Sequence, residues 1–102
     1  MQELYLADDL MPLVADNLKL ATCRYKFREI YPGQLRLRAT NGSCKDIVVE
    51  VHTVVHTSFN RLNDEQIKVE AFDRNDLCKA MKSFYPDFVW DSPVTFVQWS
   101  KI

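Results

Sequence analysis

The residues from Asp46 to Phe59 form a continuous segment dominated by valine, isoleucine and threonine. β-Branched side chains favour strands, because their restricted χ1 angles suit a pleated surface better than a helix. Strands usually run for roughly 5–6 residues, so we expect a bend or a β-bulge within this one. The segment therefore predicts a β-sheet that contains one unusually long strand.

Three further segments alternate in the manner of strands. A period of two begins at Ala21, repeats at residues 35–38 after a turn at residues 31–34, and returns at residues 93–99. The apolar side of these strands and of the long one is predicted to be buried, and it comprises Tyr25, Phe27, Leu35, Leu37, Val49, Val51 and Phe96.

Helical spacing occurs in three places. Residues 8–17 predict a short helix with Asp8 or Asp9 as its cap, and residues 63–70 predict a second that opens on a capping box between Asn63 and Gln66. Residues 73–85 predict a third, which a Tyr-Pro pair ends. The order of helix, strands, two helices and strand predicts an α+β fold, a small barrel-like sheet with helices packed over it.

Length and composition limit the classes of protein to which this chain can belong. The 102 residues, 47% of them hydrophobic, predict a single domain over residues 1–102, and the net charge of −1 excludes a histone-like polybasic binder. No apolar run reaches the ~18 residues of a membrane span, and the N-terminus does not read as a signal peptide. Cys23, Cys44 and Cys78 form no Cys-x-x-Cys pair, which favours reduced thiols in the cytoplasm over a disulfide framework or a zinc knuckle. The sequence does not indicate an oligomeric state.

No cofactor or metal site is predicted. His52 and His56 share one face of the long strand, but a catalytic zinc needs a third protein ligand, and no Asp or Cys is obviously placed to supply it.

Positive charge is concentrated in residues 19–38. This segment carries six basic residues against Glu29 alone, whereas residues 63–91 carry seven acids against four basic residues. If the two strands of the basic segment are neighbours, their charged side chains form one basic face suited to a phosphate or another electron-rich ligand. The alternative, that these are only the solvated faces of half-buried strands, carries about equal weight on spacing alone.

Lys19, Thr22 and Arg24 stand together where the first helix gives way to the first predicted strand. An amine, a hydroxyl and a guanidinium would then share one site, in which a weak nucleophile lies beside a cation that stabilises its alkoxide or, if neutral, takes its proton. By spacing alone this signal is weak.

The chain resembles the ASCH domain family, which is related to the PUA fold. The resemblance covers residues 8–101. It rests first on the motif Lys19-x-x-Thr22-x-Arg24 and on the turn and strand at residues 31–37. Two further motifs are Leu62-Asn63 with an acid at Glu70, and residues 77–86, where a leucine precedes a Tyr-Pro pair. The size and the order of elements are most similar to the small bacterial members that act as N4-acetylcytidine amidohydrolases.

The resemblance implies an enzyme that hydrolyses the acetyl amide of N4-acetylcytidine or a similar acylated nucleoside. Lys19, Thr22 and Glu70 would be catalytic, with Thr22 as the nucleophile, and the general base is left open between Lys19 and Glu70. Arg24 would hold the cytosine carbonyl or the developing oxyanion. The basic segment adds Lys26 and Arg36 as substrate-binding residues.

Two points qualify this expectation. Family members usually carry a glycine just before the motif lysine, where this chain has Asn17-Leu18, and asparagine can take its place because it tolerates a positive φ. The alternative function is an RNA-binding module, with or without ribonuclease activity, that uses an open basic groove. The basic side chains of that groove would be Arg28, Arg36 and Arg38.

Overall fold

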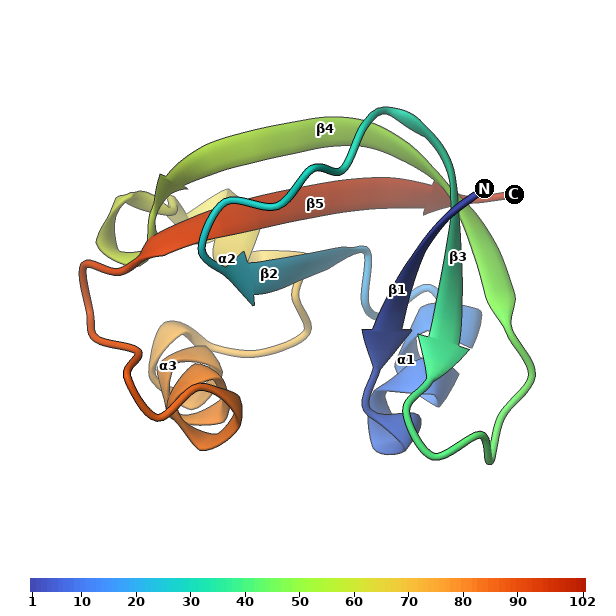
Figure 1. The fold of residues 1–102 in the computed structure, drawn as a ribbon, viewed down its shortest axis with the longest axis horizontal. Coiled ribbons are helices and arrows are strands. Elements are labelled where there is room, and N and C mark those ends of the chain that lie inside the picture. The colour runs from blue at the N-terminus through green and yellow to red at the C-terminus, as the bar shows by residue number, and fades with distance from the viewer.

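The computed structural model describes residues 1–102 and shows an α+β fold in which helices cover a strongly curled sheet (Figure 1). In chain order the elements are β1 (Gln2–Leu6), the 3-10 helix η1 (Asp8–Leu10), α1 (Met11–Ala15), β2 (Ala21–Tyr25), β3 (Gly33–Ala39), β4 (Ile47–Ser58), the 3-10 helix η2 (Phe59–Arg61), α2 (Asp64–Lys68), α3 (Arg74–Phe84) and β5 (Pro93–Lys101).

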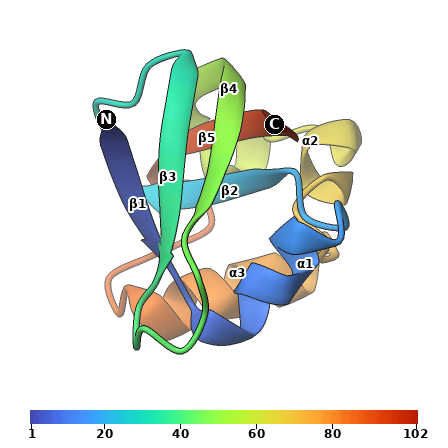
Figure 2. The same cartoon turned by 90° about the vertical axis from the view of Figure 1, so that its right-hand side faces the viewer.

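The five strands form one sheet in the order β1-β3-β4-β5-β2. Only β1 and β3 are parallel, and the other three pairs are antiparallel. The sheet curls into a half-barrel, so that its two edge strands, β1 and β2, approach each other across the open side (Figure 2). The predicted α+β class and barrel-like sheet are confirmed.

The long strand β4 connects the two halves of the sheet. It pairs with β3 through its first residues and with β5 from Val49 onward, and the register with β5 shifts between Val51 and Thr53. This irregularity is the predicted bulge. A strand of 12 residues needs it, because a bulge increases the local bend and lets one strand serve both halves of a curled sheet.

Two separate hydrophobic cores pack against opposite faces of β5, since Val97 and Trp99 belong to one and Val94 and Phe96 to the other. The first packs α1 against β1, β3 and the early part of β4, and includes Leu35, Leu37 and Trp99. The second packs α2, α3 and η2 against β2 and the start of β5, and includes Phe59 and Phe96. The gap between the two cores is where a pocket forms, as described below.

The predicted core is correct for Leu35, Leu37, Val49, Val51 and Phe96, which are all buried. The prediction is wrong for Phe27, whose side chain is 61% exposed, and Tyr25 is half-buried. The reason is that β2 ends at Tyr25, where Lys26 adopts a φ of 69°, so the period of two does not continue to residue 27.

The N-terminal region also differs from the prediction. Gln2–Leu6 forms an edge strand that we did not expect, and Asp8 does not cap a helix. Its carboxylate instead accepts hydrogen bonds from the backbone N–H groups of Asn41 and Ser43, at 2.8 and 3.0 Å, and from the Ser43 hydroxyl. These bonds lower the pKa of Asp8, with the Ser43 hydroxyl as the main cause, and tie η1 to the loop after β3.

The C-terminal helices begin as predicted. Asn63 and Gln66 form a reciprocal capping box at the start of α2, with both bonds at 2.8 Å. Asp73 caps α3 by accepting from the backbone N–H of Asp76. The helix α2 is five residues long, and Glu70 in the segment that follows it is buried.

Candidate functional site

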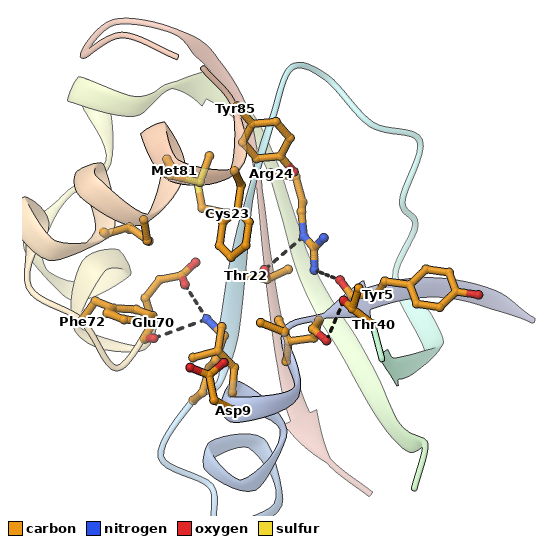
Figure 3. Close-up of a pocket in the computed structure, with 17 residues that line it drawn as sticks. Tyr5, Asp9, Thr22, Cys23, Arg24, Thr40, Glu70, Phe72, Met81 and Tyr85 are labelled. Atoms are coloured by element: carbon orange, nitrogen blue, oxygen red, sulfur yellow. Dashed lines mark hydrogen bonds and ion pairs between the residues drawn. The ribbon is translucent and has the colours of Figure 1, made fainter. Parts of the chain in front are cut away.

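The main pocket lies between the two cores and has a volume of about 460 Å³ (Figure 3). Its walls come from the end of β1, η1, β2, the segment after α2, and α3. Apolar side chains dominate the lining, and the polar groups that interrupt them include Lys19, Thr22, Arg24 and Glu70. The topology thus brings together residues that are 51 positions apart in the chain.

Lys19 is directed inward by the way α1 ends. Asn17 has a φ of 58°, and the N–H groups of Asn17 and Leu18 donate to the carbonyls of Val14 and Leu13 at 3.1 and 2.8 Å. This is a Schellman motif with asparagine in the left-handed position that glycine usually takes. The prediction that Asn17 replaces the missing glycine is confirmed, and the reversal of the chain leaves Lys19 only 2% exposed.

Lys19 and Glu70 form a buried ion pair. The distance from Lys19 Nζ to Glu70 Oε2 is 2.7 Å, and Nζ also lies 3.4 Å from the backbone carbonyl of Glu70 and 5.5 Å from the centre of the Phe72 ring. A backbone hydrogen bond of 2.8 Å from Leu20 to Val69 aligns the two segments. Two of the residues that the resemblance implies to be catalytic are therefore in direct contact.

Glu70 has one oxygen without a partner. Oε2 accepts from Lys19, but Oε1 is buried and has no hydrogen-bond donor, although the residue is only 1% exposed. Burial raises the pKa of Glu70, and the nearby Lys19 and Arg24 charges oppose that rise. A buried acceptor of this kind is costly to leave unpaired, so the site is suited to a ligand that supplies an N–H or O–H group.

Thr22 and Arg24 lie two residues apart on the edge strand β2. Arg24 Nε donates to Thr22 Oγ1 at 3.2 Å, and Arg24 Nη2 donates to the backbone carbonyl of Tyr5 on β1 at 2.6 Å. Arg24 thus bridges the two edges of the half-barrel while holding the threonine hydroxyl, and burial lowers the pKa of its guanidinium. Thr22 is only 4% exposed. Although β2 is an edge strand, this side chain is therefore buried in the wall of the pocket and does not face solvent.

Cys23 lines the pocket between these two residues. Burial, with a further contribution from Glu70, raises the pKa of its thiol well above the usual value. Because the thiolate is the reactive form of cysteine, Cys23 is a poor nucleophile and packs as a small apolar side chain.

The structure does not bring Lys26 or Arg36 to this pocket. Lys26 is exposed in the turn after β2, with its Nζ 5.4 Å from the centre of the Tyr25 ring. Arg36 lies within 3.5 Å of Glu3 and 4.0 Å of Asp46. The expected common basic face does not form, because β2 and β3 are separated by β4 and β5 in the sheet.

Sequence reasoning missed the part of the pocket that β1 and the helices contribute. Tyr5 supplies the carbonyl for Arg24, while Phe72, Phe84 and Tyr85 supply aromatic walls. The alternation of Leu4 and Leu6 with more polar neighbours could have predicted the strand β1. No local pattern, however, indicates which side chains meet across the open side of a half-barrel.

The structure contains no group of three or more His, Cys, Asp or Glu side chains placed to hold a metal ion. None of its helices combines the length and the apolar character that crossing a bilayer requires.

Comparison with solved structures defines the class of the fold. No protein-family model and no curated protein matches the sequence. The ASCH domain from Lactobacillus crispatus has a similar structure, with a TM-score of 0.76, 13% sequence identity, and coverage of 98% of this chain and 78% of that one. A protein from Enterococcus faecalis is similar with a TM-score of 0.70, 16% identity, and coverage of 100% and 80%. The chain therefore has the ASCH/PUA-like fold, a curled half-barrel with few helices.

Proposed function

We propose that this protein is a hydrolase of the ASCH family that removes the acetyl group from N4-acetylcytidine or a similar acylated nucleoside. The observation that carries the proposal is the buried Lys19–Glu70 pair, which faces one pocket together with the Thr22 hydroxyl. Enzymes often place a carboxylate of raised pKa beside a nucleophile in a largely apolar pocket, because such a group accepts and returns a proton near neutral pH.

The pocket suits a ligand of nucleoside size. Its volume of about 460 Å³ falls within the range of roughly 300–1,000 Å³ that is common for small-molecule sites. Phe72, Phe84 and Tyr85 give it flat aromatic walls against which a pyrimidine ring can pack.

In the proposed reaction Thr22 Oγ1 attacks the acyl carbon, and its proton passes to the Lys19–Glu70 pair. We assign Glu70 as the group that takes the proton, because Lys19 Nζ acts as the hydrogen-bond donor and the Glu70 carboxylate as the acceptor in this pair. The C–N bond then breaks, and the nitrogen leaves as the cytosine amine with the proton that Glu70 returns. Water next hydrolyses the acyl ester on Thr22, which releases the acid and restores the hydroxyl.

The unpartnered Glu70 Oε1 supports an amide substrate in particular. A secondary amide carries an N–H group that pairs with this oxygen, whereas an ester has none. Arg24 has five N–H donors, and the bonds to Thr22 and Tyr5 use two of them. The others support the expectation that Arg24 stabilises the acyl oxygen as it becomes negative.

The alternative is an RNA-binding module without this chemistry, which the likeness to an ASCH domain also suggests. The open groove expected for it uses Arg28, Arg36 and Arg38. Arg38 lies 3.5 Å from Asp46 and 3.6 Å from Glu3, and Arg36 lies near the same two acids. Because both arginines already face carboxylates, this surface favours phosphate binding less than the sequence suggested.

The direct test is to incubate the protein with N4-acetylcytidine and to follow cytidine by chromatography. We expect Thr22→Ala to abolish most turnover and Thr22→Ser to retain part of it, since serine keeps the hydroxyl and loses only a methyl group. Thermal unfolding of both variants serves as the control for folding. Turnover of Thr22→Ala close to that of the wild type would exclude Thr22 as nucleophile.

A further inference from the structure

The main pocket has two chemically different ends. At one end α3 and its neighbours form an aromatic wall of Phe72, Phe84 and Tyr85. The other end is formed by η1 and by the residue that follows β3, and its polar side chains are Asp9 and Thr40. Figure 3 shows Asp9 and Tyr85 at opposite ends of the pocket. Asp9 and Thr40 are both exposed, so we call these two residues the polar rim of the pocket.

The polar rim presents hydrogen-bond acceptors and no free donor. The Asp9 carboxylate can only accept, and it forms no ion pair in this structure. The Thr40 hydroxyl donates its proton to the carbonyl of Leu6 at 3.1 Å, which leaves its oxygen available as an acceptor. A ligand group that binds at this end must therefore supply O–H or N–H donors.

The backbone that carries the polar rim is held in place by hydrogen bonds on both sides of Asp9. The carboxylate of the preceding residue, Asp8, accepts two backbone hydrogen bonds from the loop after β3, at 2.8 and 3.0 Å. The N–H of Thr40 donates to the carbonyl of Leu6 at 2.9 Å. A group on a fixed backbone loses less conformational entropy when a ligand binds, so it discriminates between ligands more effectively.

The mouth of the pocket carries an uncompensated negative charge. Four charged side chains line the pocket, and two of them, Lys19 and Glu70, are buried and pair with each other. The third, Arg24, is half-buried and already donates to Thr22 and to the carbonyl of another residue. Asp9 is therefore the one exposed charge in the lining.

One basic side chain approaches this end from outside the pocket. The guanidinium of Arg38 lies 5.8 Å from the centre of the ring of Tyr5, which lines the pocket. Arg38 also lies 3.5 Å from Asp46 and 3.6 Å from Glu3. Two carboxylates already compensate its charge, so it does not offset the charge of Asp9.

The sugar of a nucleoside meets the requirements of the polar rim. In cytidine the exocyclic nitrogen and the ribose are attached at opposite positions of the pyrimidine ring. A ring that packs against the aromatic wall with its exocyclic nitrogen at Glu70 thus directs the ribose away from Glu70. Ribose hydroxyls are donors, whereas a phosphate group at neutral pH offers acceptors and carries about two negative charges.

We propose that Asp9 is a specificity-determining residue that selects a nucleoside without phosphate groups. The Asp9 carboxylate accepts from one ribose hydroxyl and Thr40 accepts from another, while the negative charge of Asp9 repels the phosphates of nucleotides and of polynucleotides. This inference rests on the proposed function for the identity of the base, and it narrows the substrate to the free nucleoside.

The test uses isothermal titration calorimetry with three ligands that require no hydrolysis: cytidine, cytidine monophosphate, and dideoxycytidine, which lacks both secondary hydroxyls of the ribose. We expect the wild type to bind cytidine about 10-fold more tightly than dideoxycytidine, because a hydrogen bond to a carboxylate is lost. Cytidine monophosphate should bind about 5- to 30-fold more weakly than cytidine, because its phosphate lies near a like charge.

Two variants of Asp9 separate its charge from its hydrogen bond. Asp9→Ala should weaken the binding of cytidine by about 10-fold and leave the binding of dideoxycytidine unchanged. Asp9→Asn keeps an acceptor but removes the charge, so it should reduce the difference between cytidine and cytidine monophosphate to about twofold or less. Thermal unfolding shows whether each variant is folded.

Asp16→Asn is the matched control for net charge. Asp16 is exposed, follows α1, forms no ion pair and does not line the pocket. We expect this variant to leave all three affinities unchanged. An effect as large as that of Asp9→Asn would show that net charge, and not the position of Asp9, determines the preference.

Three results would overturn the role of Asp9: no measurable binding of cytidine, equal affinity of the wild type for cytidine and cytidine monophosphate, or equal losses for cytidine and dideoxycytidine in Asp9→Ala. The proposed function fails separately. A protein with the expected ligand preferences that releases no cytidine from N4-acetylcytidine would keep Asp9 as the selecting residue and lose the hydrolase. Hydrolysis without any dependence of these affinities on Asp9 would do the reverse.

Discussion

Asn17 and Ala71 determine how Lys19 and Glu70 meet. Both have a positive φ, of 58° and 66°, and each stands next to the segment that carries a member of the ion pair. A left-handed residue reverses the direction of the chain, and Lys19 follows the turn at Asn17 by two positions while Glu70 directly precedes the turn at Ala71. The chemistry of the site therefore depends on two residues whose own side chains take no part in it.

Substitution at Asn17 tests this dependence. We expect Asn17→Val to reduce the free energy of unfolding by about 1–2 kcal/mol, because a β-branched side chain is unfavourable in the left-handed region. Asn17→Gly should change it little, since glycine adopts this conformation freely. Chemical denaturation of the two variants measures the difference, and equal stability would show that the Schellman motif is not retained in solution.

Glu70→Gln tests the carboxylate. The amide keeps the shape of the side chain but cannot accept and return a proton, so turnover of N4-acetylcytidine should fall by about 10²–10⁴-fold. Glu65→Gln, an exposed glutamate of α2, is the matched control and should be neutral. Wild-type turnover in Glu70→Gln would exclude Glu70 as the proton carrier.

The pKa of Glu70 gives a second measurement. Since burial raises it above the ordinary value of 4.5, the folded protein binds this proton more tightly than the unfolded chain. The contribution of Glu70 to stability is therefore full below about pH 4.5 and is lost as the pH rises through the raised pKa. A carbon-13 NMR titration of the carboxyl group should give a midpoint above 4.5, and a midpoint below it would contradict the effect of burial.

At the scale of elements, the end of β2 separates two environments. Up to Tyr25 the strand pairs with β5 in regular antiparallel register, and Ala21 and Cys23 belong to the second core. One residue later the left-handed Lys26 ends the alternation, so Phe27 lies on the surface. The alternation of buried and exposed side chains along a strand thus predicts burial only for residues that form backbone hydrogen bonds with the neighbouring strand.

A pair of truncations tests this boundary. Leu37→Ala on β3 should reduce the free energy of unfolding by about 2–5 kcal/mol, because Leu37 is completely buried. Phe27→Ala should change it by no more than about 0.5 kcal/mol, as is usual for an exposed side chain. Denaturant unfolding of the two variants gives the comparison, and a large loss in Phe27→Ala would indicate that its ring is buried in solution.

At the scale of the whole molecule, the open side of the half-barrel is closed by a side chain and not by backbone pairing. β1 and β2 are the two edges of the sheet, and Arg24 joins them through the Tyr5 carbonyl. The same guanidinium contacts the Thr22 hydroxyl, so closure of the barrel and organisation of the site depend on one residue.

Arg24→Lys should therefore loosen β1. A lysine keeps the charge but lacks the planar fork that reaches Tyr5 and Thr22 together. We expect the amides of β1 to exchange hydrogen roughly tenfold faster in the variant, while those between β4 and β5 are unchanged. Hydrogen exchange followed by mass spectrometry or NMR measures this, and unchanged exchange in β1 would show that the bridge contributes little to closure.

Features that depend only on neighbouring residues were predictable from the order of amino acids. The bulged strand β4, the capping box at Asn63 and the left-handed turn at Asn17 each follow from local sterics and local hydrogen bonds, which a pattern of a few residues encodes. The resemblance through Lys19, Thr22 and Glu70 also led to three residues that line one pocket.

The strand order, and with it the composition of the site, could not be predicted from local patterns. Arg36 lies far from Arg24 in the sheet because β4 and β5 separate their strands, and this arrangement is set by packing between distant segments. The same applies to the Tyr5–Arg24 bridge and to Thr95, which fixes the turn at Lys26 from 69 residues away. Such contacts depend on how a curled sheet brings its two edges together. Because this arrangement involves distant segments, no periodic pattern in the sequence predicts it.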